Sequence, residues 1–220
     1  MKKLINQLIE QKYLKSPLII NAFKKIKRAD FVPKEIIREK GKEFVNEFNA
    51  PLTIGYGQTI SQPLTVAFML ELLQPKKGDK ILDIGSGSGW QTAMLCQIVG
   101  DQGFVHAIEI VPELKNFGQD NVSKYKFKNV EFICGDGSKG LEEQAPFDKI
   151  IAAASAREIP LAWKKQLKVG GRLVIPVENS IWLLTKEKAP TQGRDPDSKN
   201  VGNFKEKEYP GFVFVPLISE

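Results

Sequence analysis

The stretch Ile81-Leu82-Asp83-Ile84-Gly85-Ser86-Gly87-Ser88-Gly89 decides the fold class of this chain. Its first four residues are apolar except for Asp83, as in a buried strand, and glycines then occupy every second position. In open α/β sheets, a strand that runs into a glycine-rich turn and then a helix brings the backbone close to a nucleotide-like ligand. The stretch therefore predicts a parallel sheet with a binding crevice at this turn.

From residue 80 onward, strand-like and helix-like apolar patterns alternate. This alternation predicts a Rossmann-like, doubly wound α/β fold, with a seven-stranded, mostly parallel sheet and helices on both faces. The last two strands have no helix between them, so we expect them to pair antiparallel at one edge. We expect strands at residues 80–84, 103–109, 130–134, 148–154, 172–177, 181–185 and 211–218, and helices near 89–99, 112–124 and 159–168.

The region before the sheet predicts helices and one long loop. Apolar residues recur at helical spacing from Leu4 to Ile9, and Ser16-Pro17 is typical of the start of a second helix. Residues 51–63 are rich in Gly and Pro and predict a loop, which a helix follows. We expect a single domain over 1–220, with a helical extension (1–50), a loop and helix at the active site (51–78) and a ligand-binding core (79–220).

Composition narrows the classes of protein. No apolar run reaches the ~18 residues that span a bilayer, and polar residues interrupt the region after Met1-Lys2-Lys3 where a signal peptide would be apolar. We therefore expect a cytoplasmic protein. The net charge of +6 lies wholly in residues 1–48, which hold twelve Lys/Arg and six Asp/Glu. Such an excess suits contact with RNA, but the interspersed Lys and Glu favour the solvated faces of surface helices.

Two cysteines and the single histidine predict core positions rather than a metal site. Cys96 and Cys134 lie in a predicted helix and a predicted strand, and neither has the spacing of a metal ligand. His106 lies in the middle of a predicted strand. We expect no metal.

Acidic residues mark the ends of three successive predicted strands. Asp83 ends the first strand, Glu109 ends the second and Asp136 follows the third. Glu109 comes 22 positions after Gly87, close to the ~20-residue offset at which a carboxylate reaches ribose hydroxyls. Alternatively, Asp83 caps the next helix and Glu109 is a solvated strand end. An acidic residue two positions before the first glycine suits an amino group better than a pyrophosphate, so the pattern favours adenosylmethionine over a dinucleotide.

Further motifs extend along nearly the whole chain. They are Phe31-Val32-Pro33, Pro51-Leu52, Ile54 to Pro63, Asp83 to Gly89, Ile108-Glu109, Gly135-Asp136-Gly137, Ala145 to Asp148, Gly170 to Val174 and Phe214 to Leu217. Together they resemble the protein-L-isoaspartate O-methyltransferase family. The glycine and acidic positions are shared by many adenosylmethionine-dependent methyltransferases, whereas Gly57–Pro63 and Phe214–Leu217 are more specific to this family. The chain departs from the family pattern at Asn49, where an acidic residue is frequent, and at Thr53.

The resemblance implies an enzyme that repairs damaged proteins by methylating the free α-carboxylate of L-isoaspartyl residues, with adenosylmethionine as the methyl donor. It implies that Ser61 is the active-site hydroxyl. The residues that it places around the cofactor are Thr59, Ile60, Asp83, Gly85, Ser86, Gly87, Glu109, Asp136 and Gly137. A carboxylate nucleophile is ionised at neutral pH and needs no general base, which suits a chain without an evident catalytic histidine.

Two other functions compete with this interpretation. An RNA methyltransferase would have a similar cofactor site, but the chain has no Asn/Asp-Pro-Pro-aromatic motif and no cysteine placed to attack a base. A non-catalytic adenosylmethionine-binding module would not need Ser61, which is present. We expect isoaspartyl-containing proteins and peptides as partners, no nucleic acid, no membrane and a monomer.

Overall fold

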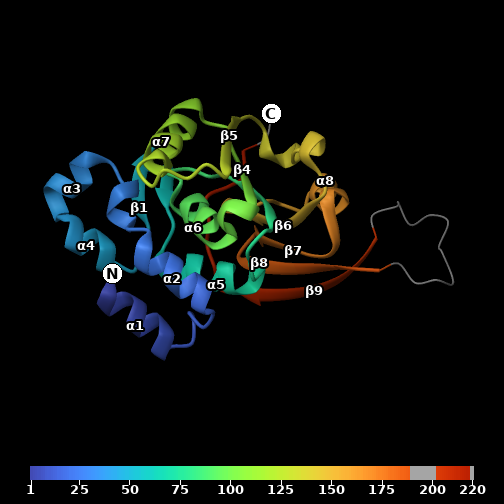
Figure 1. Ribbon diagram of the computed structural model, residues 1–220, viewed down its shortest axis with the longest axis horizontal. Helices are drawn as coiled ribbons and strands as arrows, with labels where there is room; N and C mark the ends of the chain where they lie inside the picture. The colour runs from blue at the N-terminus through green and yellow to red at the C-terminus, as the bar shows by residue number, and fades with distance from the viewer. Residues whose placement is uncertain (189–201, 219–220) are drawn as a thin grey trace.

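A seven-stranded sheet forms the centre of the protein in the computed structural model, which describes residues 1–188 and 202–218 (Figure 1). The strands are β3 (Lys80–Ile84), β4 (Phe104–Glu109), β5 (Val130–Cys134), β6 (Phe147–Ala152), β7 (Leu167–Val177), β8 (Ser180–Glu187) and β9 (Asn203–Pro210). Their order is β5-β4-β3-β6-β7-β8-β9. Strands β3 to β7 pair in parallel, and β8 and β9 add antiparallel at one edge. The predicted fold class is confirmed.

Helices cover both faces of this sheet. They are α1 (Lys2–Glu10), α2 (Pro17–Lys25), α3 (Lys34–Lys40), α4 (Lys42–Glu47), α5 (Pro63–Leu73), α6 (Trp90–Val99), α7 (Pro112–Ser123) and α8 (Leu161–Gln166), with short 3-10 helices η1 (Arg28–Phe31), η2 (Gly100–Gln102), η3 (Gly137–Lys139) and η4 (Glu142–Gln144). Successive residues of β3 enter different cores. Ile81 belongs to a core cluster that includes residues of α1, α2, α5, α6 and α7, whereas Leu82 belongs to a second cluster that includes Trp163 of α8.

The predicted N-terminal helices form, and α2 begins at Pro17 directly after Ser16, as predicted. In α1, Leu4, Ile5 and Leu8 are buried, whereas Ile9 is 38% exposed. Ser16 precedes α2 without a side-chain capping bond, because its hydroxyl donates to Glu71 of α5 at 2.7 Å instead. Within the described ranges, no helix is both long enough and apolar enough to cross a bilayer.

The segment predicted as a loop at 51–63 contains a β-hairpin. Strands β1 (Leu52–Gly55) and β2 (Gln58–Ile60) pair antiparallel. They are joined by Tyr56 and Gly57, which have φ angles of +54° and +71°. Positive φ at both central residues matches the twist of a tight hairpin. The prediction missed it because Tyr56, unlike Gly or Asn, does not signal such a turn.

The last predicted strand is also wrong. Residues 211–218 form a loop joined to the sheet by an isolated bridge between Ser155 and Pro216, and the last strand is β9. The sequence predicts no strand at β9, because an exposed edge strand carries charged side chains on both faces and lacks an apolar pattern. The segment 186–210 as a whole is polar. The rest of that segment, 189–201, lies outside the described residues.

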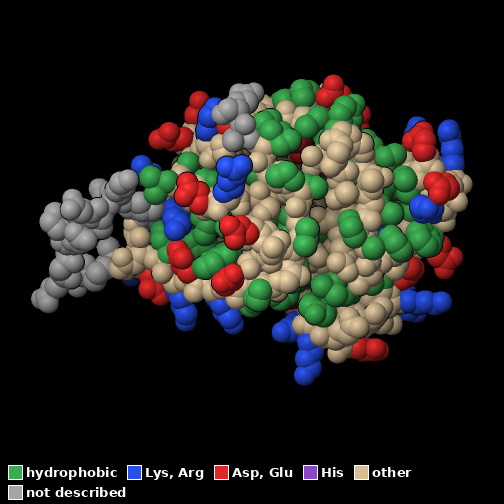
Figure 2. All heavy atoms as spheres, turned by 180° about the vertical axis from the view of Figure 1, so that it is seen from behind, with side chains coloured by type: hydrophobic (Ala, Val, Ile, Leu, Met, Phe, Trp, Pro, Cys, Tyr) green, Lys and Arg blue, Asp and Glu red, His purple; other side chains and the backbone are tan. Residues whose placement is uncertain are grey.

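One cysteine prediction is confirmed and the other is wrong. Cys96 is buried in α6. Cys134 is exposed because it ends β5, an edge strand of the sheet. His106 is 4% exposed and lies within hydrogen-bonding distance of Glu131. At the centre of the face in Figure 2, hydrophobic side chains are interspersed with backbone and uncharged polar side chains, and charged side chains are more frequent around them.

Candidate active site

A cavity of about 310 Å³ opens where the carboxyl ends of β3, β4 and β6 meet the β1–β2 hairpin. The sheet supplies Ile84, Gly85, Gly87, residues 108–111, Gly135, Gly137, Ala153 and Ala154. The hairpin and the start of α5 supply Pro51, Ile54, Gln58, Thr59, Ser61, Gln62 and Thr65, and the C-terminal loop supplies residues 213–218. Segments far apart in the sequence therefore share one cavity at the position expected for a ligand in this fold.

Glu109 connects the end of β4 to the glycine-rich turn. Its Oε2 accepts a hydrogen bond from the backbone amide of Gly87 at 2.8 Å, and its Oε1 accepts from Val111 at 3.1 Å. Glu109 is 6% exposed and lines the cavity. Two backbone amides thus fix a carboxylate that still has lone pairs for a ligand.

Asp83 lies behind the turn and is not among the residues that line the cavity. Its two carboxylate oxygens accept hydrogen bonds from Gln91 at 2.8 Å and from Thr92 at 2.6 Å, in the first turn of α6. Asp83 is fully buried, and this burial raises the pKa of its carboxyl to about 6. In this structure, Asp83 therefore holds the start of the next helix, as in the alternative interpretation of the sequence.

The glycines of the turn permit close packing as well as close approach. Gly87 has φ +51° and lines the cavity. Gly89 has φ +83°, and a Cβ there would lie 2.8 Å from the carbonyl oxygen of Gly118, so α7 packs directly on the turn. A Cβ on Gly137 would lie 2.5 Å from Ile84 Cγ2. Side chains at Gly89 and Gly137 would push these elements apart.

Of the remaining predicted cofactor residues, some line the cavity and others lie behind its wall. Thr59 lines the cavity, whereas Ile60 alternates to the opposite face of β2 and is 4% exposed. Ser86 is buried, and Asp136 accepts a hydrogen bond from the Ser138 amide at 2.9 Å at the start of η3. Neither Ser86 nor Asp136 is among the lining residues.

Asn49 connects the segment before the hairpin to the start of α5. Its Oδ1 accepts a hydrogen bond from the Leu64 amide at 3.0 Å, in the first turn of α5. Its carbonyl accepts from Gln62 Nε2 at 2.9 Å. An amide oxygen thus satisfies a helix N-terminus where the family often has a carboxylate.

The whole chain, residues 1–220, matches the model of the protein-L-isoaspartate(D-aspartate) O-methyltransferase family. The chain belongs to this family. It is 44% identical over 177 residues to the protein-L-isoaspartate O-methyltransferase of Ignicoccus hospitalis, covering 80% of this chain and 81% of that one. It is 42% identical over 203 residues to protein-L-isoaspartate O-methyltransferase 2 of Archaeoglobus fulgidus, covering 92% and 85%.

A solved structure shares the fold. It is described as a Plasmodium falciparum putative protein-L-isoaspartate O-methyltransferase in complex with S-adenosyl-L-homocysteine. The two chains superpose with a TM-score of 0.78 at 23% identity, over 100% of this chain and 98% of that chain.

The C-terminal segment contributes residues 213–218 to the cavity. The family motif Phe214–Leu217 is in the cavity wall, but as a loop rather than the predicted strand. Ser155 holds this loop, because its amide donates to the Val215 carbonyl at 2.8 Å and its carbonyl accepts from the Leu217 amide at 2.7 Å. Val213, at the cavity margin, is 86% exposed. The specificity of this motif for the family is the sequence signal that associates it with the site.

The described lining of the cavity carries one charged side chain. Among the lining residues in the described part of the chain, Glu109 is the only ionisable one. Serine, threonine and glutamine supply the other polar side chains: Gln58, Thr59, Ser61, Gln62 and Thr65. A ligand that enters this cavity meets a single negative charge on the sheet side and neutral groups on the hairpin side.

Proposed function

We propose that this member of the family transfers a methyl group from adenosylmethionine to the free α-carboxylate of L-isoaspartyl residues in damaged proteins and peptides. One observation carries the proposal: Ser61 and Glu109, from opposite walls, line the same cavity. The family match supports the same activity. A hydroxyl for the substrate and a carboxylate for the cofactor therefore lie in one compartment.

The residues present fit adenosylmethionine. Glu109 can accept hydrogen bonds from ribose hydroxyls, and Gly85 and Gly87 present backbone rather than side chains to the cavity. The described lining residues include no Lys, Arg or His that would hold a pyrophosphate. Ser86 Oγ is buried without a hydrogen-bond partner among the described residues, so a polar atom remains available beside the turn. When bound, adenosylmethionine supplies an electrophilic methyl group on a sulfonium cation.

Ser61 is proposed to align the substrate carboxylate. A carboxylate is already ionised near neutral pH, so the chain must supply orientation and exclusion of water rather than a base. A hydroxyl can donate one hydrogen bond to a carboxylate oxygen and leave its negative charge in place. An arginine or a lysine would instead neutralise that charge in an ion pair. The other oxygen then stays free to act as the nucleophile.

Selection of isoaspartate is proposed to follow from geometry. An isoaspartyl residue carries its free carboxylate directly on Cα, whereas an aspartyl carboxylate lies one carbon farther from the main chain. The β1–β2 hairpin and the loop at residues 213–218 border the cavity on two sides and are our candidates for holding the peptide backbone. A shift of about 1 Å at the nucleophile lowers the rate by about 10²-fold.

One assay distinguishes methylation of isoaspartyl peptides from methylation of RNA. The protein is incubated with labelled adenosylmethionine and either an isoaspartyl peptide or bulk tRNA. We expect label in the peptide, released as methanol in base because the product is an ester. Base-stable label in tRNA, with the peptide unlabelled, would replace this function with the RNA alternative. We further propose a cytoplasmic monomer that binds no nucleic acid.

A further inference from the structure

A buried arginine contacts the main chain of the segment that carries Ser61. Arg28, in η1, is 0% exposed, and within the described ranges no carboxylate lies within ion-pair distance of it. Its guanidinium lies 5.6 Å from the centre of the Trp90 ring. Burial lowers the pKa of Arg28 to about 10, so the group stays charged at neutral pH. A buried charge is costly unless it is well hydrogen-bonded, so its partners matter.

The partners of Arg28 are backbone carbonyls at both ends of the hairpin. Nη2 donates to Ala50 at 2.7 Å, just before β1, and to Ile60 and Ser61 at 3.3 and 3.2 Å, at the end of β2. The two longer distances fit one N–H shared between two carbonyls. One nitrogen thus joins the two ends of the hairpin.

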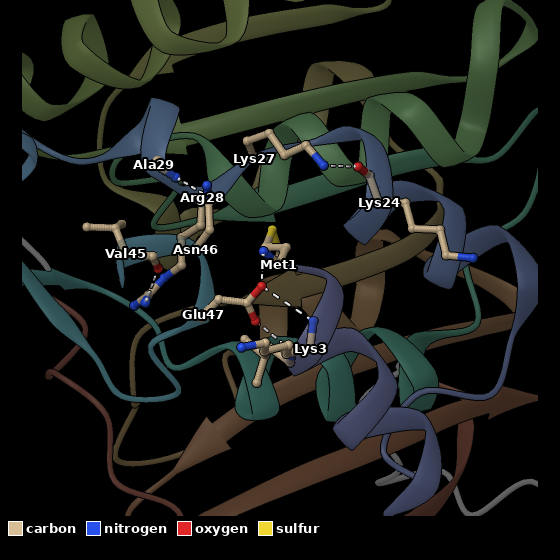
Figure 3. A network of polar contacts seen from close by, with 10 residues as sticks. Met1, Lys3, Lys24, Lys27, Arg28, Ala29, Val45, Asn46 and Glu47 are labelled. Atoms are coloured by element: carbon tan, nitrogen blue, oxygen red, sulfur yellow. Dashed lines mark hydrogen bonds and ion pairs between the residues drawn. The ribbon is translucent and has the colours of Figure 1, made fainter. Parts of the chain in front are cut away.

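The other terminal nitrogen ties the hairpin to α4. Nη1 donates to Phe48 at 2.8 Å and to Val45 at 3.4 Å, and Figure 3 shows Arg28 reaching the main chain at Val45. The neighbouring Ala29 amide donates to Asn46 Oδ1 at 3.0 Å. On the other side, Glu47 accepts from the Leu4 amide at 2.7 Å and pairs with the N-terminal amine. The end of α4 is therefore fixed, and it gives the hairpin a rigid base.

We propose that Arg28 is a positioning residue for methyl transfer, because its guanidinium fixes the main chain of Ser61 relative to the end of α4. This inference rests on the proposed role of Ser61. A planar guanidinium presents five donors in a fixed fork, whereas a lysine ammonium is a point charge on a flexible stem. Lysine at this position would keep the charge but could not hold the hairpin ends and α4 together.

The first test compares Arg28→Lys with the parent protein. We expect kcat with an isoaspartyl peptide to fall about tenfold or more, because alignment is lost. The dissociation constant of adenosylhomocysteine, measured by calorimetry, should change by less than about threefold. Hydrogen exchange of the amides at residues 51–62 should become faster. The matched control is Arg172→Lys, since Arg172 donates to the Leu72 carbonyl at 2.8 Å near the end of α5 and is not a cavity residue.

A double-mutant cycle distinguishes positioning from general stability. If Arg28 acts through Ser61, Arg28→Lys should lower kcat much less in a Ser61→Ala background than in the parent. Equal loss in both backgrounds, or an Arg28→Lys protein with parental kcat and hairpin exchange, would overturn the proposal. Arg28→Gln is made in parallel, and failure of both variants to fold would also contradict it. If the parent itself does not methylate isoaspartyl peptides, the proposed function fails, while hydrogen exchange still reports whether Arg28 orders the hairpin.

Discussion

Glu109 Oε2 lies 2.8 Å from the backbone nitrogen of Gly87, so the carboxylate at the end of β4 also fixes the glycine-rich turn that follows β3. The same side chain lines the cavity. One residue therefore shapes the turn and faces the ligand, which makes its removal doubly harmful to cofactor binding.

Glu109→Ala should weaken the binding of adenosylmethionine by about 1.5–3 kcal/mol, as expected for losing hydrogen bonds to a charged acceptor. Calorimetry with adenosylmethionine and adenosylhomocysteine measures this loss. Glu113→Ala, in the first turn of α7, is the matched control and should bind normally. Unchanged affinity in Glu109→Ala would exclude a role in cofactor binding.

Ser61→Ala should affect turnover more than cofactor affinity. Alignment of the nucleophile is expressed in the transition state, so kcat should fall by about tenfold or more while the dissociation constant of the cofactor stays the same. Steady-state kinetics and calorimetry give the two values. Ser123→Ala, an exposed serine at the end of α7, controls for loss of a hydroxyl. Parental kcat in Ser61→Ala would reduce Ser61 to a turn residue.

Asp83 should make stability depend on pH. Burial raises its pKa to about 6 in the fold, from an ordinary value of 3.8. The folded protein therefore holds this proton more tightly than the unfolded chain. The resulting stabilisation is complete below about pH 4 and is lost as pH rises through 6.

Comparison with Asp83→Asn isolates this effect, because the other titrating groups are common to both proteins. Between pH 4 and pH 7.5, the stability of the parent should fall relative to Asp83→Asn by about 2 kcal/mol, part of the full shift because the unfolded carboxyl is already partly ionised at pH 4. Denaturant unfolding at the two pH values measures the difference. A difference that does not vary with pH would mean that Asp83 titrates normally.

Peptide affinity should depend on the charge of the bound cofactor. Glu109 is the only ionisable residue among the described lining residues, so no lining side chain offers a positive charge to the substrate carboxylate. An isoaspartyl peptide should bind several-fold more tightly beside an adenosyl analogue that carries an ammonium group than beside adenosylhomocysteine, which is neutral at sulfur. A gain of about 1 kcal/mol is reasonable for a partly solvated pair. Equal affinities by calorimetry would contradict it.

The local pattern was sufficient to predict the parallel part of the sheet, because apolar strand runs and turn glycines are recognisable over a few residues. Strands β3 and β5 have the predicted bounds. The roles of Asp83 and Glu109 could not be separated in this way, since both are acidic strand ends. Their difference depends on side-chain direction: Asp83 shares the face of Ile81 that α6 covers, whereas Glu109 lies at the open edge.

The burial of Arg28 could not be predicted from the local sequence pattern. In the sequence it is one of twelve basic residues in a segment expected to be solvated. Its burial follows from carbonyls that come together only when η1, α4 and the hairpin pack. The loop form of residues 211–218 could not be predicted for a related reason, because their apolar side chains pack as a cavity wall rather than in a strand.

The most direct test of the central claim uses two peptides that differ only in whether one residue is L-isoaspartate or L-aspartate. The ratio of their kcat/KM values for methyl transfer from adenosylmethionine is measured with the full chain. The account predicts that the isoaspartyl peptide is favoured by about 10²-fold or more, with a base-labile product. Equal kcat/KM values for the two peptides would contradict it.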